Sequence, residues 1–387
     1  MEKIMKKFFI VVTANKYPEG DAGSVRQHIF ACLLKDIGYT PVIVGLGDTT
    51  DFKERQYDGI KYYSLRYAKN NKFSKAKSHL LFCHNLKMLL KKYDAHHISG
   101  ILFVSGRENT IQFLKKYSVK HNIQLYHDSV EWYSPSEFKK GVKAKGYIAN
   151  NKLNTELIDN KFKVFAISSY LEKHFKSCGI DTIRVPVIMD TTTIDARKNI
   201  HSQYIKVVYA GQMGPKDRIV NFVKALEMLG DDELAKIKMV LIGIKKEEFE
   251  VFSGALDKRV DGCITFTGRI PRNEVLEHLK SADFTMLLRP KNERYAMAGF
   301  PTKVVESLSS ATPVISNYTS DLNMYLKDNE NAVVVLGTSV EACADALHRA
   351  VTLSFEKRTQ MQQNARKTAE EEFDYRNYMS AVKMFTL

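Results

Sequence analysis

Short apolar segments that alternate with longer amphipathic ones constrain the fold of this chain most. The apolar segments are continuous, whereas a strand with one face in water would alternate apolar and polar residues. Continuous runs predict parallel strands that helices cover on both faces. In the first half of the chain they are FFIVVTA (8–14), PVIVGL (41–46), IKYYSL (60–65), GILFVS (100–105), IQLYHD (123–128) and VFAIS (164–168).

The second half repeats this rhythm. Its runs are IKVVYAG (205–211), IKMVLIGI (237–244), ITFTG (264–268), FTMLLRP (284–290), TPVISN (312–317) and AVVVLG (332–337). A length of 387 residues suits two domains better than one core. The polar stretch TTTIDARKNIHSQ, which follows Asp190, is typical of a linker. We therefore predict an α/β chain of two doubly wound parallel-sheet domains, over residues 1–190 and 191–370.

Composition and charge narrow the class of protein. With 44% apolar and 26% charged residues, the chain has a globular composition. Five cysteines without a Cys-x-x-Cys pair favour a reducing cytoplasm over a disulfide framework. A formal net charge of +14 favours phosphates, anionic lipid or nucleic acid as partners. No H-E-x-x-H motif or acidic cluster ends a strand, so we expect no metal.

Ligands of an open parallel sheet bind at the carboxyl ends of its strands, where loops meet helices. Gly20 and Gly23 follow the first strand and precede a helix expected to begin near Ser24. Their bare backbone suits an anion. Because the G-x-G-x-x-G spacing is missing, a plain strand-to-helix turn is the alternative.

The segment AGFPTKVVESLSSATPVISN (298–317) follows the strand FTMLLRP. At helical spacing Thr302, Lys303 and Glu306 share one side. The helix N-terminus and Lys303 favour an anion, and a carboxylate at 306 accepts two hydrogen bonds from a vicinal diol such as ribose. This arrangement suits a nucleotide. The alternative is a solvated pair of Lys303 and Glu306.

The same segment resembles the nucleotide-binding signature of retaining glycosyltransferases of family 4. That family has the GT-B fold, with two Rossmann-like domains facing across a cleft, and its bacterial members build capsular and exopolysaccharides. DAGSVRQHIFACLLKDIGYTPVIVG, YHDSVEWYSPSEF, VFAISSYLEKHF and YAGQMGPKD extend the likeness through nearly the whole chain. The resemblance implies that Glu306 grips the ribose and that Lys216 neutralises the diphosphate. The complete predicted donor-binding set is Gly23, Lys216, Arg289, Gly299, Phe300, Thr302, Lys303 and Glu306.

The chain departs from the family pattern at three positions. Ala298 stands where the family usually has a first Glu, so a carboxylate cannot act there. Gln212 stands where an Arg is frequent, which leaves the diphosphate to Lys216 with help from Arg218 or Arg289. Pro301 replaces a frequent Gly and removes one N–H donor.

Three titratable residues end a strand of the first half: His127, Asp128 and Glu131. The resemblance implies that His127 approaches the transferred sugar. Asp128 or Glu131 would accept the proton of the acceptor hydroxyl. The alternatives are that Asp128 caps a turn, that Glu131 is solvated, and that the leaving diphosphate takes the proton, as is often thought for such enzymes.

Two further segments suggest partners and contacts. Residues 61–92 hold nine Lys or Arg, no Asp or Glu, and many aromatic residues, which favours an anionic membrane surface. No nucleic-acid-binding motif accompanies them, and a solvated lysine-rich face is the alternative. By resemblance, residues 371–387 form a helix that crosses back to the first domain, with an apolar stripe of Tyr375, Tyr378, Val382 and Phe385. A helix packed only on the second domain is the alternative.

The sequence thus predicts a retaining glycosyltransferase that uses a nucleotide diphosphate sugar, UDP rather than GDP. We expect it to extend a lipid-linked saccharide in bacterial surface polysaccharide biosynthesis, as a cytoplasmic protein peripheral on the inner face of the membrane, with no cofactor. The other hypotheses are a non-catalytic nucleotide-sugar-binding subunit and a GT-B epimerase. The donor sugar, the acceptor, the linkage and the oligomeric state stay open.

Overall fold

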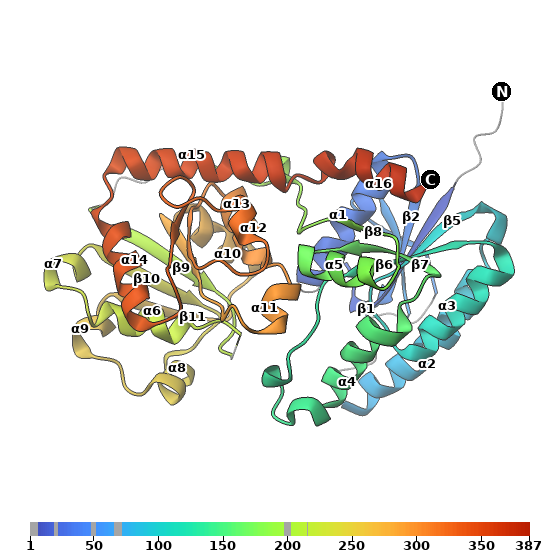
Figure 1. Ribbon diagram of the computed structural model, residues 1–387, viewed down its shortest axis with the longest axis horizontal. Coiled ribbons are helices and arrows are strands. Elements are labelled where there is room, and N and C mark those ends of the chain that lie inside the picture. Colours follow the sequence, from blue (N-terminus) through green and yellow to red (C-terminus); the bar gives the residue numbers. More distant parts are fainter. Residues whose placement is uncertain (1–6, 19–21, 48–51, 66–71, 197–202, 215) are drawn as a thin grey trace. The chain divides into compact units, whose positions relative to one another are not determined.

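The computed structural model (Figure 1) describes residues 7–18, 22–47, 52–65, 72–196, 203–214 and 216–387. It divides into two compact units. The first unit comprises Met1–Tyr133, Val142–Met189 and Tyr375–Leu387. The second comprises Ser134–Gly141 and Asp190–Asp374. The main division therefore follows Met189.

The first unit is an eight-stranded sheet in the order β3-β4-β2-β1-β5-β6-β7-β8. All neighbouring strands pair in parallel except β3 and β4, which form an antiparallel hairpin. The strands are β1 (Phe8–Lys16), β2 (Thr40–Leu46), β3 (Arg55–Tyr57), β4 (Ile60–Ser64), β5 (Ile98–Phe103), β6 (Gln124–Ser129), β7 (Phe162–Ala166) and β8 (Thr182–Arg184). The α-helices are α1 (Ala22–Asp36), α2 (Lys72–Leu90), α3 (Glu108–His121), α4 (Lys145–Lys152), α5 (Ser169–Ser177) and α16 (Met379–Thr386).

The second unit is an all-parallel sheet in the order β11-β10-β9-β12-β13-β14. Its strands are β9 (Ile205–Ala210), β10 (Ile237–Ile242), β11 (Ile264–Gly268), β12 (Phe284–Leu287), β13 (Val314–Ser316) and β14 (Ala332–Val334). Its helices are α6 (Ile219–Leu226), α7 (Asp231–Leu234), α8 (Lys246–Ser253), α9 (Lys258–Asp261), α10 (Arg272–Lys280), α11 (Arg294–Ala298), α12 (Thr302–Ser309), α13 (Leu322–Tyr325), α14 (Val340–Thr352) and α15 (Phe355–Glu372).

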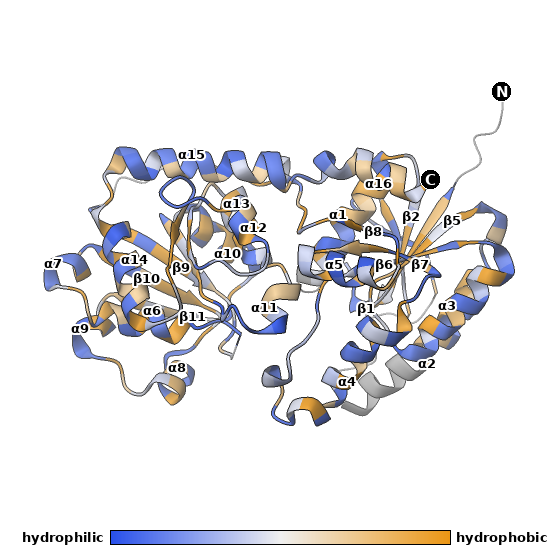
Figure 2. Cartoon of the chain, in the orientation of Figure 1, coloured by the Kyte–Doolittle hydropathy of each residue, from blue (hydrophilic) through white to orange (hydrophobic). Residues whose placement is uncertain are grey.

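Both sheets are covered on their two faces, as the continuous apolar runs predict. Four consecutive residues of β1, Phe9 to Val12, are completely buried. A strand that faced water on one side would expose every second residue. Figure 2 shows apolar residues concentrated on the strands, whereas α15 is largely hydrophilic. The α/β class and the two doubly wound sheets are confirmed.

The C-terminal residues belong to the core of the first unit. Tyr375, Val382 and Phe385 are buried in its main apolar cluster, and Tyr378 packs against that cluster. The ring centroid of Phe385 lies 5.2 Å from that of Phe165. Figure 1 shows α16, in red, beside the blue α1. The side chains of the predicted apolar stripe thus pack together on this unit.

The chain reverses its direction of winding at one point in each sheet. In the second unit β9 leads outward through β10 and β11, and β12 then returns to the other side of β9. The loops after β9 and β12 therefore diverge, one to each face of the sheet. This switch point is where doubly wound sheets leave room for a ligand.

Replacing Phe385 with Ala should lower the free energy of unfolding by about 3 to 5 kcal/mol, because a buried ring would leave a cavity. Urea denaturation measures this change. Met384→Ala is the control, since its side chain is 73% exposed against 7% for Phe385. Equal stabilities of the two variants would contradict the placement of α16 in the core.

Candidate functional site

A buried carboxylate lies at the centre of the switch point of the second unit. Asp217 follows β9, and its Oδ1 accepts a hydrogen bond of 2.8 Å from Nε of Arg289, which follows β12. Its Oδ2 accepts 2.6 Å from Nζ of Lys303, in the first turn of α12. The hydroxyl of Tyr209, in β9, also donates to Oδ2 at 2.9 Å. Three elements that are distant in sequence therefore meet at one carboxylate.

Charge pairing keeps this cluster ionised despite its burial. Burial alone would raise the pKa of Asp217, but the charges of Lys303 and Arg289 hold it well below its usual range. Burial lowers the pKa of Lys303, and Asp217 opposes that shift. Burial and the adjacent carboxylate raise the pKa of Tyr209, so its phenol stays protonated. With two cations and one anion, the cluster keeps an excess positive charge at the ends of the strands.

Gly211 permits the close approach of the chain to this cluster. A Cβ atom at this position would collide with Nζ of Lys303 and would lie 2.6 Å from the hydroxyl of Tyr209. Only glycine fits here without displacing the cluster. Sequence reasoning found Lys303 and Arg289 but missed Asp217, which directly follows Lys216 in the segment GPKD.

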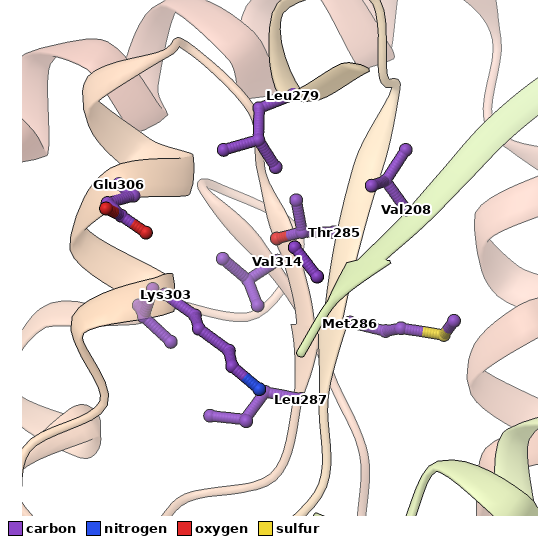
Figure 3. Close-up of a pocket in the computed structure, with 10 residues that line it drawn as sticks. Val208, Leu279, Thr285, Met286, Leu287, Lys303, Glu306 and Val314 are labelled. Atoms are coloured by element: carbon purple, nitrogen blue, oxygen red, sulfur yellow. The ribbon is translucent and has the colours of Figure 1, made fainter. Parts of the chain in front are cut away.

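Glu306 lies one turn beyond Lys303 on α12, and Figure 3 shows Lys303 extending from this helix towards the strands. Its Oε1 accepts a hydrogen bond of 2.9 Å from Nη2 of Arg272, at the start of α10. Lys303 and Glu306 therefore do not form the solvated pair, because Lys303 pairs with Asp217 and Glu306 with Arg272. A cavity of about 20 Å³ lies beside them, lined otherwise largely by apolar side chains. It has room for a water molecule but not for a nucleotide.

The other predicted donor-loop residues have mainly structural contacts. The N–H of Gly299 donates to the carbonyl of Tyr295 at 3.1 Å, so this donor is already used. The ring of Phe300 is buried against Tyr325 and Phe373. Thr302 is half-buried and begins α12 directly after Pro301.

Lys216 is tied to a segment that sequence reasoning did not assign to the second unit. Its Nζ lies 2.9 Å from Oε1 of Glu137, whose side chain is buried. The same segment donates a hydrogen bond from Ser136 to Glu293 at 2.7 Å. A diphosphate at Lys216 would therefore compete with a carboxylate that the sequence analysis had not considered. This carboxylate belongs to the segment YHDSVEWYSPSEF.

In the first unit, the predicted site residues Gly23 and His127 lie in different elements, α1 and β6. Gly23 is the second residue of α1 and so lies within the helix, while Gly20 lies outside the described residues. His127 is buried in β6, and its Nδ1 lies 2.9 Å from the carbonyl oxygen of Phe103. Because a carbonyl only accepts, Nδ1 carries the proton and Nε2 is left as an acceptor. Burial lowers the pKa of His127 to about 4, so its imidazole is neutral at pH 7.

Asp128, predicted to accept the proton of the acceptor hydroxyl, is paired with an arginine. Its carboxylate is buried and receives a bidentate contact from Arg26, with Nη2 at 2.7 Å and Nε at 2.9 Å. Arg26 also donates to the carbonyls of Val185 and Pro186. The pair therefore fixes α1 to the strand ends. Both carboxylate oxygens of Asp128 accept hydrogen bonds from Arg26 and not from the backbone of a turn.

Glu131 is held through its main chain. Its carbonyl accepts hydrogen bonds of 3.3 Å from the amide groups of Asn150 and Asn154. Its side chain is partly buried. The structure thus fixes the backbone at Glu131 and leaves its predicted role as a base an open hypothesis.

The basic stretch 61–92 is described only in part, because residues 66–71 and the side chains of 72–80 lie outside the described residues. Among its described lysines, Lys61 pairs with Glu54 at 2.7 Å and Lys92 donates to the carbonyl of Phe52 at 3.1 Å. These two lysines already have partners within the unit.

The described residues show neither a cluster of metal ligands nor a helix that could span a membrane. No group of three or more His, Cys, Asp or Glu side chains in this part of the chain is placed to hold a metal ion. No helix there combines the length and the apolar character that crossing a bilayer requires.

Asp217→Asn should lower the free energy of unfolding by about 3 to 5 kcal/mol, because it leaves two cations facing each other without their counter-ion. Guanidinium denaturation measures the loss. Asp261→Asn, which breaks an exposed pair with Lys246, should cost less than about 1 kcal/mol. A loss at Asp217 no greater than at Asp261 would show that the cluster does not hold the loops together.

The depressed pKa of His127 makes stability depend on pH. The unfolded imidazole binds a proton near pH 6.5 and the folded one only near pH 4. Stability is therefore fully present above pH 6.5 and falls by up to about 3 kcal/mol as the pH drops to 4. Urea titrations at each pH measure this change. We expect His127→Gln to lack the loss of stability at low pH, whereas His84→Gln, which replaces an exposed histidine, should retain it. A wild type and a His127→Gln variant with parallel pH profiles would rule out a buried neutral His127.

Parts of the chain are similar to known proteins. Residues 190–368, nearly all of the second unit, match the model of the family described as Glycosyl transferases group 1. A GDP-Man:Man(3)GlcNAc(2)-PP-Dol alpha-1,2-mannosyltransferase of Xenopus laevis is 26% identical over 206 residues, which are 50% of this chain and 41% of the relative. The match thus spans less than half of that relative's length.

Solved structures share the fold over nearly the whole chain. Sucrose-phosphate synthase from Thermosynechococcus elongatus has a TM-score of 0.75 at 12% identity, and the match covers 98% of each chain. The HepE protein of Anabaena, in complex with UDP and glucose, has a TM-score of 0.67 at 13% identity, covering 98% of this chain and 100% of that one. At such identities the likeness shows the fold alone. Residues 190–368 thus match the group 1 glycosyltransferase family, and nearly the whole chain shares the GT-B fold of these solved structures.

Proposed function

We propose that the protein transfers a sugar, with retention of anomeric configuration, from a nucleotide diphosphate sugar to a saccharide acceptor. One observation carries this proposal: at the switch point of the second unit, a cationic cluster lies one helical turn from the carboxylate of Glu306 on α12. Lys303 and Arg289 supply positive charge there, and Glu306 supplies hydrogen-bond acceptors one turn away. A diphosphate needs the first feature and a ribose the second.

Each part of the donor then has a chemical counterpart. The diphosphate lies at the N-terminus of α12, where the helix dipole and Lys303 attract it. The ribose hydroxyls donate to the carboxylate of Glu306. Lys216 moves from Glu137 to the diphosphate, exchanging one anionic partner for another. These cations stabilise the negative charge that develops on the leaving group, which is the largest contribution expected in such a transfer.

The reaction needs one proton transfer. The bond between the anomeric carbon and the diphosphate oxygen breaks, and the acceptor hydroxyl oxygen bonds to that carbon on the same face. Asp128 is bound to Arg26 and unsuited to take the hydroxyl proton. The leaving diphosphate oxygen takes it instead, so no protein base is required. His127, neutral and with a free acceptor nitrogen by its tautomer, would accept a hydrogen bond from a sugar hydroxyl.

UDP is the nucleotide that we propose. The Anabaena neighbour was solved with UDP, whereas the name of the Xenopus relative specifies GDP-mannose. The acceptor that we propose is a lipid-linked saccharide in surface polysaccharide assembly, at the inner membrane face. Support comes from the net charge of +14, the basic stretch 61–92 and the lipid-linked acceptor in the relative's name.

A non-catalytic nucleotide-sugar-binding subunit is the second candidate. Ala298 is completely buried, so it supplies no group to a donor. Slow release of UDP from UDP-sugars by the purified protein supports an enzyme. Tight UDP-sugar binding without turnover, even with membrane extract as acceptor source, would favour the subunit.

Glu306→Ala should weaken the binding of UDP by about 1 to 3 kcal/mol, because the ribose loses hydrogen bonds to a charged acceptor. Isothermal titration calorimetry measures the affinity, and exposed Glu330→Ala is the matched control. Unchanged affinity in the Glu306 variant would eliminate the ribose role and, with it, the main support for the proposed donor site.

A further inference from the structure

We propose that Arg272 is a positioning residue that orients the carboxylate of Glu306 for the ribose and thereby sets the preference for ribonucleotides. This inference rests on the proposed function of Glu306 as the ribose ligand. Arg272 was not among the predicted site residues.

The contact between the two residues is directed. Nη2 of Arg272 lies 2.9 Å from Oε1 of Glu306, and the residues are 34 positions apart in sequence. Arg272 begins α10, directly after its N-cap Pro271, while Glu306 lies in the second turn of α12. The pair thus joins two helices that border the same strand ends.

The unequal burial of the pair indicates which partner is oriented. The side chain of Glu306 is 19% exposed, whereas that of Arg272 is 58% exposed. Arg272 reaches from solvent to a carboxylate that is largely enclosed by the protein. An exposed ion pair contributes little to stability, so stability alone does not account for this contact. Its effect is to hold one oxygen of Glu306 and so to fix the plane of its carboxylate.

A fixed carboxylate plane matters for a vicinal diol. Two hydroxyls must donate to the two oxygens of one carboxylate, and both hydrogen bonds depend on its orientation. A carboxylate that is already oriented loses less conformational freedom when the ribose binds. Lone pairs remain on both oxygens after one contact from Arg272, so the ribose and the arginine share Glu306 without displacement.

Arg272 also neutralises the charge of Glu306, which would otherwise repel the diphosphate. The two effects differ in their consequence for ligand preference. Loss of charge neutralisation weakens the binding of every nucleotide diphosphate equally. Loss of orientation weakens ligands that have both ribose hydroxyls more than those that lack one. Comparing UDP with 2′-deoxy-UDP therefore separates them.

The test measures dissociation constants of both nucleotides by calorimetry for the full chain. We expect Arg272→Ala to raise the dissociation constant of UDP about five- to tenfold and that of 2′-deoxy-UDP less than about twofold. The preference for UDP would then fall. In a Glu306→Ala background the same substitution should change neither constant by more than about twofold, because its effect acts through Glu306. Arg259→Ala, which removes an exposed arginine that pairs with Asp231, is the control and should alter neither.

Three results would overturn the inference. One is an unchanged preference for UDP in Arg272→Ala, whether both affinities stay the same or both fall equally. Another is an undiminished effect of Arg272→Ala in the Glu306→Ala background. The third is a loss of UDP affinity in Arg259→Ala that equals the loss in Arg272→Ala. Failure of the wild type to bind any nucleotide diphosphate is a separate outcome that refutes the proposed function itself.

Discussion

The ion cluster around Asp217 is the interaction on which the proposed donor site depends. Three of its hydrogen bonds join the loop after β9, the loop after β12 and the first turn of α12. Two cations held close together at a buried carboxylate would repel each other without that counter-ion. Asp217 removes that repulsion and leaves one net positive charge where the sheet changes its direction of winding. The fold thus holds charges in place before any ligand arrives, which is how such sites stabilise developing charge.

The first unit uses the same device for a different purpose. Arg26 and Asp128 form a buried bidentate pair that also anchors the carbonyls of Val185 and Pro186. This pair holds α1 at the ends of the strands. His127, the neighbour of Asp128, is neutral and keeps one nitrogen as an acceptor. A titratable residue at the end of a strand can therefore have a structural role, and only its partners decide which role it has.

The sheets followed from the sequence, because continuous apolar runs directly report strands that are buried on both faces. The strands β3 and β8 did not, because their sequences, RQY and TIR, are not continuous apolar runs. Glu306 and Lys303 were predicted because a helix places them on one side. Asp217 and Arg272 were not, because their partners lie 72 to 86 and 34 positions away, and only the folded chain brings them together. Arg26 had a signal: it shares helical spacing with the buried Phe30 and Leu33, which marks an arginine facing the core.

The central claim is that a nucleotide diphosphate binds over the ends of β9 and β12. A crystal structure of the protein in complex with UDP tests this claim most directly. We predict diphosphate oxygens within hydrogen-bond distance of Lys303 at the N-terminus of α12, and ribose hydroxyls at Glu306. UDP bound away from α12, or at α12 with its ribose turned from Glu306, would contradict the account.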